Sequence, residues 1–74
     1  MEELFEGIVI FFIPKRGYGF LEWYKNGIRQ SDLFVHYSDI LINGFKTLNK
    51  NQKVSFKLGK NANGIIKAID VTLI

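Results

Sequence analysis

The chain is short, mildly basic and free of cysteine, and these properties restrict what it can be. Its 74 residues include ten Lys and Arg against seven Asp and Glu, which leaves a net charge of +3. A chain of this length forms a single domain, here 1–74, and without disulfides or thiolate metal sites its apolar residues must supply the core. The longest apolar run, Ile8–Ile13, is far shorter than the roughly 20 residues that span a bilayer. The acidic start is also unlike a secretory signal, so we expect a cytoplasmic protein that does not enter a membrane.

Taken in chain order, five stretches have the β-branched and aromatic content of strands and the alternation of half-buried ones. They are Glu6–Ile13, Tyr18–Tyr24, Asp32–Tyr37, Val54–Leu58 and Ile65–Leu73. Pro14 ends the first strand, and Gly19 within the second marks a bulge or a close approach by another group. The pairs Asn26-Gly27 and Asn63-Gly64 predict hairpin turns, and Ile28–Ser31 returns from the first of them towards the third strand.

The predicted fold is all-β, a five-stranded antiparallel barrel with one short helical turn after the third strand. That turn is expected at Ser38–Leu41, with Ser38 as its N-cap. An open sheet of five short strands would expose two edges, so closure into a barrel is favoured. An SH3-like barrel and an OB-fold both fit, and the long polar connection Asn43–Gln52 favours the OB-fold. The interior is expected to contain Val9, Leu21, Leu33, Val35, Ile40, Val54, Phe56, Ile69 and Val71.

Two of the predicted strands carry aromatic rings at alternate positions. Side chains at i and i+2 share a face, so Tyr18 and Phe20 lie together on the second strand, as Phe34 and His36 do on the third. The opposite faces supply core residues, and a barrel this small has no second layer that could bury the rings. The aromatic face is therefore predicted to be a binding surface.

Several motifs of the chain resemble those of the cold-shock domain family. The stretches Glu6–Phe12 and Arg16–Phe20 are similar to the opening of that domain, and Asp32–Ile40 is similar to its second ribonucleoprotein motif and the turn after it. The match continues in register through Gly44–Leu48, Gln52–Phe56 and Asp70–Thr72. The resemblance implies a five-stranded OB-fold barrel that binds single-stranded RNA or DNA, often as an RNA chaperone or a regulator of transcription or translation.

The resemblance also implies which residues contact the nucleic acid. By position it implies a set of stacking rings: Phe11, Phe12, Tyr18, Phe20, Phe34, His36, Tyr37 and Phe45. Phe11 stands where the family usually has a tryptophan. Arg16 matches a residue that contacts the backbone, and Asp32 matches an acid that hydrogen-bonds a base edge.

Three further side chains are candidates from the residues alone. Lys15 and Lys46 could contact phosphates. Trp23 either caps the barrel or its long hairpin, or extends the stacking surface by another base. Phe11 and Phe12 are adjacent, so ideal alternation places only one of them on the aromatic face unless a bulge intervenes.

The first strand is more apolar than the family pattern, which usually has lysines at the positions of Ile8 and Ile10 and asparagine at that of Ile13. We therefore expect rings, more than lysines, to provide affinity. Ideal alternation places Ile8, Ile10 and Phe12 opposite Val9. The prediction is that Leu4, Phe5 or a second protomer covers this face, giving a monomer or a weak homodimer, and the alternative is that barrel coiling turns these residues inward.

No catalytic or metal-binding constellation is visible in the sequence. His36 is the only histidine, without cysteine or a carboxylate cluster beside it, and Thr47 and Ser55 have no base to activate them. We expect no enzyme activity, no metal and no cofactor. The alternative to nucleic-acid binding is a protein-interaction module that uses the apolar first strand and the exposed aromatic residues.

Overall fold

The computed structural model describes residues 3–41, 44 and 47–74, which form a mainly antiparallel β-barrel with one 3-10 turn. The strands are β1 (Phe5–Ile13), β2 (Tyr18–Lys25), β3 (Ile28–Arg29), β4 (Leu33–His36), β5 (Lys53–Lys60) and β6 (Ile66–Leu73). The turn, η1 (Tyr37–Asp39), follows β4. Among these residues no helix is both long and apolar enough to cross a bilayer.

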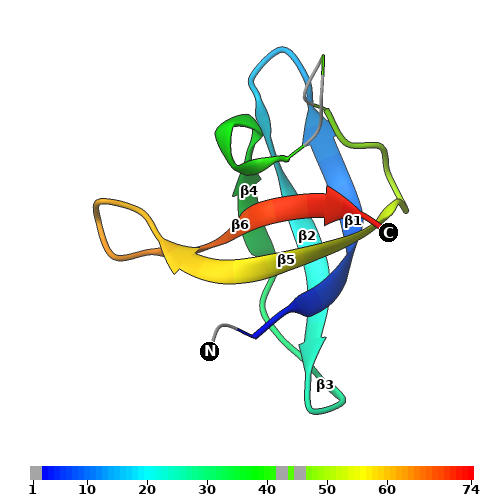
Figure 1. The fold of residues 1–74 in the computed structure, drawn as a ribbon, viewed down its shortest axis with the longest axis vertical. Coiled ribbons are helices and arrows are strands. Elements are labelled where there is room, and N and C mark those ends of the chain that lie inside the picture. The colour runs from blue at the N-terminus through cyan, green and yellow to red at the C-terminus, as the bar shows by residue number, and fades with distance from the viewer. Residues whose placement is uncertain (1–2, 42–43, 45–46) are drawn as a thin grey trace.

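Five of the strands close into a barrel, as predicted. Pairing runs from β1 to β2, β4, β6 and β5 and back to β1, whose first half pairs with β5. All of these pairs are antiparallel except β4 with β6, a short parallel contact at Phe34↔Lys67 and Val35↔Ala68. Within the described ranges, the 2-residue β3 pairs with the end of β2 and with no other strand. The resulting hairpin lies at the opposite end of the molecule from η1 (Figure 1).

The hairpin between β2 and β3 turns where the sequence predicts. Asn26 and Gly27 both have positive φ, 54° and 79°, as a type I′ turn requires. Glycine adopts this conformation without steric cost, and asparagine tolerates it better than most residues. The Asn-Gly pair therefore accounts for the sharp return of the chain at this point.

A bulge in β1 changes which of its side chains face outwards. Val9 pairs with Leu21, but the next pair is Phe11 with Phe20, so Ile10 is an extra residue in the strand. Phe12 then pairs with Gly19 and is partly buried against the core. The expectation that Phe12 lies on the face opposite Val9 is therefore wrong, because the extra residue shifts the alternation by one.

Among the residues that the structure describes, twelve buried apolar ones form the core: Phe5, Val9, Leu21, Trp23, Leu33, Val35, Ile40, Leu48, Val54, Phe56, Ala68 and Val71. The predicted interior position of Ile69 is wrong, because this side chain is only half-buried. A second bulge is the cause. Asp70 has φ 50°, and the register with β5 shifts between Ser55 and Lys57. Ala68 and Val71 therefore both point inward although they are three positions apart.

The turn after β4 begins one residue earlier than predicted and has a different cap. The N-cap is His36, whose side chain accepts a hydrogen bond from the backbone N–H of Ser38. The Ser38 hydroxyl pairs with the same imidazole nitrogen instead of capping the backbone. Ser38 is therefore inside the turn, and the prediction that it is the N-cap is wrong. The ion pair between Lys67 and Asp39, at 2.9 Å, links η1 to β6.

A substitution at Gly19 tests how closely β1 approaches β2. A Cβ atom there would meet the carbonyl oxygen of Phe11 and lie 2.7 Å from Cα of Phe12, both backbone atoms. We expect Gly19→Ala to lower the free energy of unfolding by about 3 kcal/mol, because neither atom can move without separating the strands. Chemical denaturation measures this change.

The matched control is Gly27→Ala, which adds the same methyl group in open space at positive φ. We expect it to cost only about 1–2 kcal/mol, from backbone strain. Equal losses of unfolding free energy in the two variants would show that the backbone of β1 does not lie in close contact with Gly19.

Candidate nucleic-acid interface

Strand register brings the predicted rings to one outer face of the barrel. Phe20 pairs with Phe34 and also with Phe11, so it lies between β4 and β1. Tyr18 pairs in the same way with His36 and with Ile13. We call the six rings of this face and its end the aromatic platform: Phe11, Tyr18, Phe20, Phe34, His36 and Tyr37.

The rings of the aromatic platform form an unbroken series of contacts. Phe20 meets Phe11 and Phe34 edge to face, with ring centroids 5.5 and 5.9 Å apart. Phe34 then lies nearly parallel to both Tyr18 and His36, at 5.9 and 6.4 Å. Such offset and edge-to-face geometries are favourable in themselves. Each ring is thus supported by its neighbours, while Phe11 and Tyr37 are exposed and the other four rings are partly exposed.

Tyr37 ends the series and connects it to the loop between β1 and β2. Its ring is 4.5 Å from that of His36, and it remains 48% exposed. The backbone N–H of Tyr37 donates to the carbonyl of Gly17 at 2.8 Å, and its ring lies over that glycine. This contact holds the exposed loop side chains Lys15 and Arg16 at the same end of the molecule as Tyr37.

The hydrogen bonds of His36 determine which ring nitrogen is available. Nδ1 accepts from the backbone N–H of Ser38 at 3.3 Å and is 2.8 Å from the Ser38 hydroxyl. A backbone N–H can only donate, so Nδ1 must be the acceptor. The neutral imidazole therefore carries its hydrogen on Nε2, where it can be donated to a ligand.

Asp32, predicted to contact a base edge, is held in an ion pair. Arg29 donates to its Oδ1 at 3.0 Å and lies 3.9 Å from Glu22, and the hydrogen bond to Asp32 raises the pKa of Arg29. Tyr24 donates to the same Glu22 at 2.9 Å, which raises the pKa of the Tyr24 phenol. This end of the β2 face is therefore a network of paired charges.

Trp23 belongs to the core. It is 7% exposed, and its ring contacts those of Phe5 and Phe56 at 5.2 and 5.8 Å. Its indole N–H donates to the carbonyl of Ser31 at 3.0 Å, which ties the long hairpin to the barrel. It does not extend the stacking surface.

Of the other predicted residues, Phe12 is partly buried and packs against the core. Phe45 and Lys46 lie outside the described residues. The sequence analysis named Ile13 only through the family pattern, and the strand register now shows that it is a neighbour of the rings. It pairs with Tyr18 and is 37% exposed. Only the bulge at Ile10 places it there, and no residue type in β1 signals that bulge.

A family model described as the "Cold-shock" DNA-binding domain matches residues 5–74. The chain is 41% identical over 69 residues to a "Cold shock protein" of Arthrobacter globiformis, covering 93% of this chain and 97% of that one. It is 44% identical over 59 residues to "Cold shock protein CspC" of Bacillus subtilis, covering 80% and 83% of the two chains.

A third relative, "Cold shock-like protein CspA" of Bordetella pertussis, is 48% identical over 50 residues, which cover 68% of this chain and 70% of that one. Fold and matches together define a small β-barrel of a nucleic-acid-binding class. The chain belongs to the cold-shock domain family.

The position of Trp23 is open to a direct test by fluorescence, since it is the single tryptophan of the chain. Because the indole is buried, we expect emission at shorter wavelength in the folded protein than in denaturant, and weak quenching by iodide. Free N-acetyltryptophanamide serves as the control for full exposure. Quenching of the folded protein as strong as that of the free compound would contradict a buried indole.

Proposed function

We propose that this chain binds single-stranded RNA or DNA by stacking bases on the aromatic platform. The observation that carries the proposal is the unbroken series of half-exposed rings across β1, β2 and β4. Stacking of a base on an aromatic side chain contributes about 1–3 kcal/mol and is tolerant of base identity. Bases within a duplex are already stacked on each other, so the platform favours open strands.

The distribution of charge indicates which end of the platform faces phosphates. Lys15 and Arg16 lie at the Tyr37 end, where phosphates can approach them. At the other end, Glu22 and Asp32 share the single cation Arg29, so this cluster keeps a net negative charge and adds no attraction for phosphates. The rings, and not a dense basic surface, therefore supply most of the affinity. The Nε2 hydrogen of His36 adds one donor for a base acceptor or a phosphate oxygen.

The proposed activity is that of a non-catalytic binding domain without metal or cofactor. A protein that binds only the open strand shifts RNA away from its hairpins by mass action. This is the physical basis of an RNA chaperone, and the same preference for open strands allows it to regulate transcription or translation. The barrel acts as one domain that covers a handful of nucleotides, within the roughly 4–16 of a single OB-fold.

Removing a central ring should weaken binding. Phe20→Ala and Phe34→Ala each lose one stacking contact, so we expect dissociation constants about tenfold higher for a short pyrimidine single strand. Fluorescence anisotropy of a labelled strand measures this. Tyr24→Ala is the matched control, because Tyr24 is an exposed aromatic outside the platform.

Both platform variants also lose packing between rings, so each is checked by circular dichroism and accompanied by Phe34→Leu, which keeps the apolar volume but not the ring. Unchanged binding in the folded variants, or equal affinity for the matching duplex, contradicts the proposal.

Salt dependence should be shallow. If two to four phosphates are neutralised, the slope of log K against log salt is about −0.7 for each. Arg16→Gln should reduce that slope by about 0.7 because one phosphate contact is lost. Lys60→Gln, an exposed lysine at the far end of β5, is the control. A steep slope that Arg16→Gln leaves unchanged would place the phosphate contacts elsewhere.

A further inference from the structure

Strand register arranges the platform face of the barrel in two rows that cross β1, β2 and β4. One row is aromatic throughout and consists of Phe11, Phe20 and Phe34. The other consists of Ile13, Tyr18 and His36. Directly opposed residues of neighbouring antiparallel strands point to the same side of the sheet, with Cβ atoms about 4.5–5.5 Å apart. The Tyr18 ring therefore has an aliphatic side chain on one flank and an imidazole on the other.

Ile13 is the apolar flank of this second row, and its backbone is held by the loop after β1. Its carbonyl accepts from the backbone N–H of Gly17 at 2.8 Å and from that of Arg16 at 3.0 Å. The side chain is 37% exposed, and a β-branched side chain has few rotamers available at χ1. Ile13 therefore presents a well-positioned apolar surface beside the Tyr18 ring.

His36 is the polar flank of the same row. Its Nδ1 accepts from the backbone N–H of Ser38, so the neutral ring carries its hydrogen on Nε2. A base stacked on Tyr18 would then meet methyl groups at one edge and an N–H donor at the opposite edge. The row selects a base that has an alkyl group on one side and a hydrogen-bond acceptor on the other.

Thymine is the common base with this arrangement of groups. Its 5-methyl group and its O2 acceptor lie at opposite corners of the pyrimidine ring. Uracil and cytosine have O2 but no methyl group, and adenine and guanine have no alkyl group at any edge. Apolar contact with the methyl group is a recognised way of distinguishing thymine from the other bases.

We propose that Ile13 is a specificity-determining residue that contacts the 5-methyl group of thymine, so that the chain binds thymine-containing single strands in preference to uracil-containing ones. This inference rests on the proposed stacking of bases on the aromatic platform and adds the base that the Tyr18 position takes. Thymine and uracil differ only in the methyl group, so neither stacking on Tyr18 nor the donor of His36 explains a preference between them. The contact with Ile13 does.

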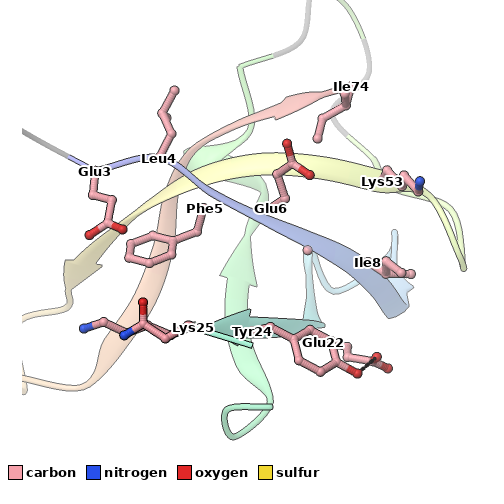
Figure 2. A pocket seen from close by; sticks show the side chains of 12 residues that line it. Glu3, Leu4, Phe5, Glu6, Ile8, Glu22, Tyr24, Lys25, Lys53 and Ile74 are labelled. Atoms are coloured by element: carbon pink, nitrogen blue, oxygen red, sulfur yellow. Dashed lines mark hydrogen bonds between the residues drawn. The ribbon is translucent and has the colours of Figure 1, made fainter. Parts of the chain in front are cut away.

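Ile8 provides a matched control on the same strand. It is 36% exposed, against 37% for Ile13, and its side chain lines a groove near Glu22, at the start of β1 (Figure 2). The expectation that Leu4 or Phe5 covers Ile8 is wrong, because Leu4 is 63% exposed and Phe5 is in the core. Truncation of either isoleucine therefore removes a similar exposed apolar group, but only that of Ile13 lies beside the platform rings.

The test compares two single strands of equal length and the same deoxyribose sugar, one of thymine and one of uracil, by fluorescence anisotropy. We expect the ratio of the dissociation constants, uracil to thymine, to fall about threefold in Ile13→Ala, slightly less than full burial of one methyl group gives. The ratio should stay unchanged in Ile8→Ala. Circular dichroism checks that both variants are folded.

The contact is also measured directly in the unsubstituted protein, by nuclear Overhauser effects between ¹³C-labelled isoleucine methyl groups and the thymine methyl. We expect them from Ile13 and not from Ile8. An unchanged ratio in Ile13→Ala, an equal fall in both variants, or thymine contacts at Ile8 instead would each overturn the role of Ile13 while leaving stacking intact. Failure of both strands to bind would overturn the proposed function itself, and this inference with it.

Discussion

One extra residue in β1, Ile10, determines which side chains the barrel shows to solvent. Without it, Phe11 would share the inward face of Val9. With it, Val9 remains fully buried and Phe11 moves outward against Phe20. The backbone can shift in this way because the opposite strand has a glycine, Gly19, with no side chain in the path of β1. The core and the aromatic platform therefore depend on the same bulge. After it, Phe12 packs against the core and Phe11 joins the platform.

Alternation and turn chemistry predicted most of this fold, and the bulges account for most of the rest. The strand pattern, the Asn26-Gly27 hairpin and closure into a barrel follow from local sequence. The local sequence does not show that Ala68, and not Ile69, is in the core. That depends on the backbone conformation of Asp70 and on the register of β6 with β5. A bulge is a property of two strands together, and neither strand encodes it in its own residue types.

The candidate site could be predicted where it depends on alternation within one strand. Tyr18 and Phe34 needed only a period of two and a small core. The pairing of Asp32 with Arg29 could not be foreseen, because it depends on how the β3 hairpin folds back. As a result, Asp32 lies beside a cation, whereas Lys15 and Arg16 are exposed near Tyr37 at the other end of the platform.

The contacts among the platform rings also affect how binding energy is distributed. Phe34 touches Phe20, Tyr18 and His36, so removing it changes the support of three neighbours. Residues in such direct contact are thermodynamically coupled, and their substitutions do not add. For a strand stacked on these rings, the free energy of binding is therefore not the sum of contributions from individual base–ring pairs. Consecutive nucleotide positions would then be read cooperatively, with an imperfect fit at one ring changing the affinity of the next.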